Sequence, residues 1–164
     1  MSSRAETSDL HMIDLARRHQ AVAEDVEHRV IQALRSGHYI GGPTVAEAER
    51  TCATLLSRSG AVGVNSGTDA LMFALQAVGV RPGDHVIVPA LTFFATAGAV
   101  CSIGAIPVVV DILEDGLVDP SAVERAMTSS VRAVIPVHLF GGAANLPAQP
   151  VPCVDDLAQA IGSD

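Results

Sequence analysis

The chain has 164 residues, and its 18 Asp and Glu residues against 10 Lys and Arg residues give a net charge of −8 with histidine neutral. With 49% hydrophobic and 17% charged residues, it can build a core, which excludes disorder for most of its length. The acidic balance disfavours nucleic-acid binding, because phosphate contacts need clustered basic residues. No apolar run reaches the roughly 18 residues of a membrane helix, and residues 1–6 lack the apolar stretch of a secretory signal. We therefore expect a cytoplasmic protein without membrane contact.

Two residue types limit the available chemistry. All ten basic residues are arginine, so the 164 residues contain no lysine. Reactions that need a side-chain amine cannot be carried out by this chain's own side chains. Cys52, Cys101 and Cys153 are widely spaced among apolar neighbours, which predicts buried free thiols in a reducing compartment. The six histidines show no ligand spacing with the cysteines, so we expect no metal site.

The first third of the chain is predicted to be helical. Residues 1–11 are polar, and we expect them to form a flexible N-terminus. Apolar residues at helical spacing predict a helix over residues 18–35, which Gly37 ends as a left-handed residue. Thr44 and Glu47 then form the pattern of a capping box that opens a second helix. The side chains that this second helix should bury are Val45, Ala48, Cys52, Leu55 and Leu56.

After Gly60 the sequence alternates between strands and helices. Short β-branched apolar runs predict strands over residues 61–64, 85–88, 107–110, 132–137 and 151–154. Helices are expected over residues 68–78, 94–103 and 120–127, the last with Asp119 as cap and Pro120 in its first position. Uninterrupted apolar strands are typical of a sheet that is buried on both faces. The chain is therefore predicted to be α/β, with a mostly parallel sheet and helices on both faces.

Ligands of such sheets bind at the carboxyl ends of the strands, so the residues that follow each strand are candidates. After strand 61–64, Gly67 forms a turn into a helix between Ser66 and Thr68. Free backbone N–H groups and hydroxyls at such a turn can bind a phosphate. The alternative, favoured on local grounds alone, is that Ser66 or Thr68 merely caps the helix.

Two aromatic residues, Phe93 and Phe94, follow strand 85–88. One of them could cover the face of a planar ligand, although placement of both in the core is the commoner arrangement. His138 follows strand 132–137, and a lone histidine beside apolar residues is more often a hydrogen-bonded structural residue than a catalyst.

Adjacent carboxylates, Asp155 and Asp156, follow strand 151–154. At a buried strand end they need a partner. Asp156 and Gln159 would share one face if a helix has begun there. The alternative, equally favoured, is a helix-capping aspartate.

Together these residues would complement a ligand with a phosphate, a flat aromatic ring and a protonated ring nitrogen. Pyridoxal 5′-phosphate (PLP) has all three parts, and an aspartate on the pyridine nitrogen keeps that ring an electron sink. A dinucleotide site is the nearest rival, but the turn after the first strand lacks the G-x-G-x-x-G pattern.

Seven sequence blocks in order resemble the DegT/DnrJ/EryC1/StrS family of PLP-dependent sugar aminotransferases of fold type I. The blocks span residues 36–43, 64–71, 82–89, 92–96, 104–111, 136–141 and 155–160. The resemblance implies that Gly67 and Thr68 hold the cofactor phosphate and that Phe93 stacks on the pyridine ring. It also implies that Asp156 pairs with the ring nitrogen and that Gln159 lies near the ring hydroxyl.

By the same resemblance, the reaction would transfer an amino group, usually from glutamate, to a keto-sugar on a nucleoside diphosphate. The products of such reactions feed polysaccharide, lipopolysaccharide and antibiotic sugars. Members are usually homodimers in which both chains contribute to each site, so a homo- or hetero-oligomer is expected.

The family's Schiff-base lysine lies beyond the block that contains Gln159, and no lysine is present here. By this resemblance, we expect residues 12–164 to correspond to the N-terminal portion of the PLP-binding large domain, without the rest of that domain or the small C-terminal domain. We expect that the chain has no catalytic lysine of its own and cannot turn over alone. Three readings remain open: a split enzyme completed by a second chain, an inactive truncated remnant, and an interaction module that pairs with an intact homologue.

One segment also departs from the family pattern. Where members have a crossover helix, residues 141–150 contain two glycines and two prolines and are predicted to form a loop. This length still permits a parallel crossover, but we expect one sheet face to lose cover.

Overall fold

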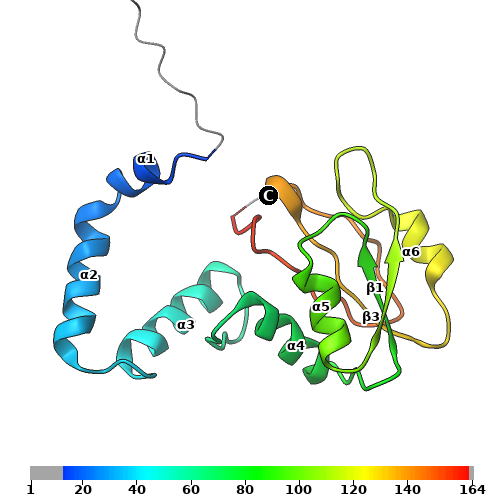
Figure 1. The fold of residues 1–164 in the computed structure, drawn as a ribbon, viewed down its shortest axis with the longest axis horizontal. Coiled ribbons are helices and arrows are strands. Elements are labelled where there is room, and N and C mark those ends of the chain that lie inside the picture. Colours follow the sequence, from blue (N-terminus) through cyan, green and yellow to red (C-terminus); the bar gives the residue numbers. More distant parts are fainter. Residues whose placement is uncertain (1–12, 163–164) are drawn as a thin grey trace, which may run out of the picture. The chain divides into compact units, whose positions relative to one another are not determined.

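The computed structural model describes residues 13–162, which belong to two compact units, Met1–Ala61 and Val62–Asp164. The tail expected over residues 1–11 lies outside the described residues. Figure 1 shows helices alone in the described part of the first unit, and a sheet with helices around it in the second. None of the helices over residues 13–162 is long and apolar enough to span a membrane.

The first unit contains α1 (Leu15–Gln20), α2 (Ala23–Ser36) and α3 (Pro43–Leu55). The helix predicted over residues 18–35 is confirmed for most of its length by α2. Gly37 ends α2 in the left-handed conformation with φ 69°, as expected from its lack of a Cβ atom. The helix α1 is separate, because Val22 leaves the helical region with φ −131° and ψ 8°.

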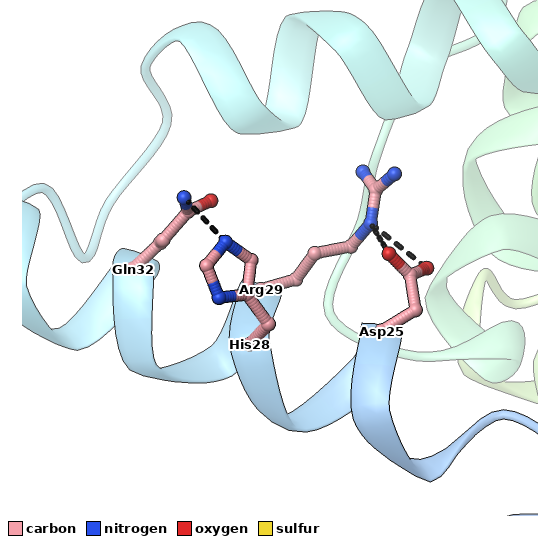
Figure 2. Close-up of polar contacts among 4 residues, drawn as sticks. All are labelled: Asp25, His28, Arg29 and Gln32. Atoms are coloured by element: carbon pink, nitrogen blue, oxygen red, sulfur yellow. Dashed lines mark hydrogen bonds and ion pairs between the residues drawn. The ribbon is translucent and has the colours of Figure 1, made fainter.

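Two side-chain pairs, each spaced by four residues, lie along α2 (Figure 2). Arg29 Nε donates to both carboxylate oxygens of Asp25 at 3.1 Å, and Gln32 Nε2 lies 2.8 Å from His28 Nε2. Pairs at this spacing each stabilise a helix by about 0.2–0.5 kcal/mol. They support a helix in which no residue is buried.

The start of α3 shows that the predicted capping box at Thr44 is wrong. Gly42 precedes the helix with φ 87°, Pro43 occupies the first turn, and no side chain caps it. Proline suits that position because its φ is fixed and its missing N–H would have no partner there. The burial expected for α3 is also wrong: none of residues 13–61 is buried, since the described helices of this unit share no core of their own.

The second unit is built around a parallel sheet in the order β2-β1-β3. Its strands are β1 (His85–Pro89), β2 (Ile106–Val110) and β3 (Val131–Val134), and its helices are α4 (Gly67–Ala77), α5 (Ala95–Ser102), α6 (Pro120–Ala126) and the short 3₁₀ helix η1 (Leu139–Gly141). Strands and helices predicted for residues 68–134 are thereby confirmed within a few residues. The cap of α6 is confirmed as well, because Asp119 Oδ1 accepts from Ser121 N at 2.8 Å.

Two predicted strands turn out differently. Residues 61–64 are not a strand. An apolar run forms a strand only when it is hydrogen-bonded to a neighbouring strand, and none of the three described strands pairs with residues 61–64. The segment 151–156 meets the end of β3 only through isolated parallel bridges, Val134 with Cys153 and Val137 with Asp156. Pro136 lies between these bridges and has no N–H to donate, so the ladder is interrupted there.

The sheet is covered on both faces, as predicted. Along β1, Val86 and Val88 belong to one buried cluster with residues of α4 and α5, whereas Ile87 belongs to another with residues of α6. Figure 1 shows α5 and α6 on opposite sides of the strands. Residues 143–149 form a loop, as expected, but Leu146 packs against the α6 cluster, so this loop supplies part of the cover that a helix would give.

Candidate functional site

The N-terminus of α4 offers two backbone donors. Ser66 caps the helix: its Oγ accepts from Asp69 N at 3.1 Å and donates to Asp69 Oδ2 at 3.0 Å, which confirms the capping interpretation of Ser66. The first turn of a helix leaves its N–H groups without intrahelical partners, and here these include those of Gly67 and Thr68. A Cβ built on Gly67 would meet nothing within 4 Å. The backbone at Gly67 is therefore accessible to an anion. The helix dipole also attracts an anion there, because it places positive potential at the N-terminus of α4.

The two phenylalanines after β1 are not core residues. Phe93 is 78% exposed and Phe94 is 82% exposed, so the commoner arrangement, with both rings in the core, is not the one found. The reason lies in α5, which buries Thr96, Ala99 and Val100 instead. Phe94 precedes α5, and its ring lies along the first turns of that helix, 3.4 Å from a Cβ built on Gly98. Phe93 thus remains an exposed aromatic ring beyond the carboxyl end of β1.

Asp156 is held beside the continuation of β3. Its N–H donates to Pro136 O at 2.9 Å, and its carbonyl accepts from His138 N at 3.0 Å. No helix follows: residues 158–162 form turns, and Asp156 Oδ1 accepts from Ala158 N at 3.1 Å. The half-buried Asp156 therefore caps a turn instead of a helix, and it lies at the same sheet edge as Phe93, because parallel strands share one carboxyl edge.

Gln159 does not share a helical face with Asp156. Its side chain instead reaches η1, where its Oε1 accepts from Phe140 N at 2.9 Å. Phe140 adopts the left-handed conformation with φ 57°, which is unusual for a bulky residue. This contact joins residues far apart in the sequence, and no sequence pattern predicts it.

His138 is buried and fully hydrogen-bonded, as the structural interpretation of this residue predicted. Its Nε2 lies 3.3 Å from Asp155 Oδ1, and its Nδ1 accepts from Ala144 N at 3.0 Å. The pairing of Asp155 with His138 answers the question of how two adjacent carboxylates are accommodated. The sequence showed both residues but not their contact.

The expectation of buried cysteines is wrong. Cys52, Cys101 and Cys153 are all exposed and free. Apolar neighbours in the sequence do not bury a side chain that points away from both clusters of the second unit or lies in the first unit, which has no described core. Partial burial of the thiol, and secondarily the negative charge of Asp155, raise the pKa of Cys153 above its ordinary value.

Comparison with known proteins shows to which family the chain belongs. The profile of the DegT/DnrJ/EryC1/StrS aminotransferase family matches residues 20–164. The chain belongs to this family. A similar relative is dTDP-3-amino-3,4,6-trideoxy-alpha-D-glucose transaminase of Streptomyces venezuelae, 40% identical over 99% of this chain and 45% of the relative.

Solved structures agree with this assignment. The S. venezuelae protein DesV superposes with a TM-score of 0.86 at 38% identity, over 95% of this chain and 44% of that chain. NtdA of Bacillus subtilis, solved with its cofactor PMP, gives a TM-score of 0.84 at 30% identity, over 98% of this chain and 39% of that chain. The chain therefore has part of the large domain of fold type I PLP-dependent aminotransferases, and it spans less than half the length of these relatives.

Proposed function

We propose that residues 12–164 are the N-terminal portion of the PLP-binding domain of an aminotransferase that acts on nucleotide-linked keto-sugars. The observation that carries the proposal is the placement of Phe93 beyond the carboxyl end of β1 and of Asp156 beside the continuation of β3, the strand next to β1, in the same unit as the open N-terminus of α4. These residues offer the three complements that PLP needs: anion donors, an exposed ring and a carboxylate.

Each residue would act on a different part of the cofactor. The N–H groups of Gly67 and Thr68, with the Thr68 hydroxyl, would bind the phosphate. Phe93 would stack on the ring, Asp156 would hold the proton on the ring nitrogen, and Gln159 would donate to the ring hydroxyl oxygen. When bound, PLP supplies an electron sink for bonds at the carbon that carries the amino group.

The amine needed for turnover is not among the 164 residues, which contain no lysine. We propose that it comes from a second polypeptide or from residues outside these 164, in a homo- or hetero-oligomer with glutamate as amino donor. The same absence favours a second candidate, a catalytically inactive form that pairs with an intact homologue. Titration of the purified chain with the lysine-bearing C-terminal part of a homologue tests the first candidate, which predicts transamination by the mixture. Titration with an intact homologue tests the second, which predicts a mixed oligomer whose activity does not exceed that of the homologue alone.

Cofactor binding is tested directly by titration with PLP and with pyridoxal, which lacks the phosphate. We expect saturable binding of PLP, weaker binding of pyridoxal, and loss of PLP affinity in Asp156→Ala. Asp111→Ala is the matched control, since Asp111 directly follows β2 and its Oδ1 accepts a local backbone bond, from Ile112 N at 2.8 Å. Equal affinity for PLP in the wild type and both variants would refute the proposed site.

A further inference from the structure

His138 links three segments of the second unit. Its side chain is buried, with 8% of the residue exposed, and both ring nitrogens have partners. Ala144 N donates to Nδ1 at 3.0 Å, and Nε2 lies 3.3 Å from Asp155 Oδ1. The ring thus connects the end of β3, the loop after η1 and the segment that carries Asp156.

These two contacts assign the tautomer of His138. A ring nitrogen that accepts a hydrogen bond carries no proton. Because Nδ1 accepts from the Ala144 amide, the proton of the neutral ring is on Nε2, where it is donated to Asp155. A hydrogen bond to a carboxylate is stronger than one between neutral groups, and its burial on the histidine side reduces competition from water.

The hydrogen bond between His138 and Asp155 gives the two adjacent carboxylates, Asp155 and Asp156, different roles. Asp155 is hydrogen-bonded to His138. The backbone of Asp156 is bonded to Pro136 and His138, and within residues 13–162 its side chain accepts from the N–H of Ala158 alone, through Oδ1. Side-chain and backbone bonds from His138 therefore hold both residues of the pair. With Asp155 committed in this way, Asp156 is the carboxylate left for a ligand.

We propose that His138 is a positioning residue that, through Asp155, orients Asp156 toward the ring nitrogen of the cofactor. The proposal rests on the proposed function for its ligand. The link itself stands on the contacts of the free protein, so it can be tested separately from cofactor binding.

The first test compares Asp155→Ala with Asp155→Asn in the 164-residue chain. Alanine removes the acceptor, whereas asparagine keeps an oxygen at the same place and should retain the bond. We expect imidazole ¹⁵N shifts that report a protonated Nε2 and an accepting Nδ1 in the wild type. Hydrogen exchange at Asp156 N–H should accelerate about tenfold in the alanine variant, the factor expected for one lost charged hydrogen bond, and should stay at the wild-type rate in the asparagine variant. A protonated Nδ1, or equal exchange in all three proteins, would overturn the link.

The second test is the affinity of the same proteins for PLP. We expect the dissociation constant to rise about tenfold in Asp155→Ala and to return to the wild-type value in Asp155→Asn, with thermal unfolding midpoints that do not follow this order. Rescue by asparagine identifies orientation, because a requirement for negative charge would leave both variants weak. A wild-type chain that fails to bind PLP would refute the proposed function and with it the ligand assigned to Asp156, while the exchange rates would still decide whether His138 holds this segment. Unchanged PLP affinity in Asp155→Ala would overturn the positioning role.

Discussion

The backbone N–H of Phe140 donates to Gln159 Oε1 at 2.9 Å and so fixes the orientation of that amide. With the oxygen engaged, the amide presents its Nε2 donors, for which residues 13–162 supply no acceptor. Gln159 is therefore prepared to donate a hydrogen bond to an acceptor such as the ring oxygen of PLP. The left-handed φ of 57° at Phe140 is part of this arrangement.

Replacement of Gln159 by glutamate tests the direction of that bond. A carboxylate still accepts from Phe140 N, so we expect the free energy of unfolding to change by less than about 0.5 kcal/mol. Because it has no N–H to donate, the affinity for PLP should fall about tenfold. Gln76→Glu makes the same charge change on the exposed surface of α4 and should bind PLP as the wild type does. Equal affinities in the two variants would contradict the role of Gln159.

Substitution of Gly67 separates a phosphate cradle from simple capping. A Cβ at Gly67 meets nothing within 4 Å and the residue is helical, so Gly67→Ala should leave stability unchanged or raise it by about 0.5 kcal/mol. If the phosphate approaches this backbone closely, the methyl group should weaken PLP binding several-fold and leave pyridoxal binding unchanged. Equal losses for the two ligands would argue against the cradle.

The capping role of Ser66 has its own test. Removal of its hydroxyl in Ser66→Ala should lower the free energy of unfolding by about 1 kcal/mol, because the N–H of Asp69 loses its acceptor. Chemical denaturation measures this loss. Ser102→Ala, at the last residue of α5, where the hydroxyl donates to the already bonded carbonyl of Gly98, should change stability little. A similar loss in both variants would point to a general effect of serine replacement.

The neighbouring phenylalanines provide a matched pair. Both are mostly exposed, so Phe93→Ala and Phe94→Ala should each change stability by less than about 1 kcal/mol. Only Phe93→Ala should weaken PLP binding, by about tenfold, the upper part of the range for aromatic stacking. Fluorescence titration of both variants measures the difference. A larger loss in Phe94→Ala would reverse the assignment.

Reactivity of Cys153 should follow its raised pKa. Alkylation requires the thiolate, so the rate for Cys153 should rise at higher pH than for an ordinary cysteine. The measurement uses a chain in which Cys52 and Cys101 are serine. Since the charge of Asp155 is the smaller of the two causes, Asp155→Asn and Asp155→Ala should both increase the rate at neutral pH without abolishing the shift. A slower reaction in either variant would contradict this electrostatic effect.

Much of the fold could be predicted because its signals are local. Residues 86–89 of β1 are apolar and buried, as their uninterrupted apolar run indicated, and Asp119 with Pro120 marks the start of α6. The predictions fail where the structure of a segment depends on the residues that it contacts and not on its own sequence pattern. Residues 61–64 resemble a strand but pair with none of the described strands, and Thr44 resembles a cap, although Pro43 already fits the first turn.

The site was predictable in its residues but not in its contacts. Phe93 and Asp156 stand out because each follows a predicted strand, and a parallel sheet brings the carboxyl ends of its strands to one edge. The bonds from Asp155 to His138 and from Phe140 to Gln159 connect residues 17 and 19 positions apart. Such contacts depend on the path of the loop after η1, for which the sequence has no periodic signal.

The central claim is that Asp156 holds a proton on the ring nitrogen of bound PLP. The most direct measurement is the ¹⁵N chemical shift of ring-labelled PLP bound to the chain, at a pH above the pKa of that nitrogen in the free cofactor. The account predicts a protonated nitrogen in the wild type and in Asp111→Ala, and an unprotonated one in Asp156→Asn. A nitrogen that titrates in the wild type as it does in free PLP would contradict the account.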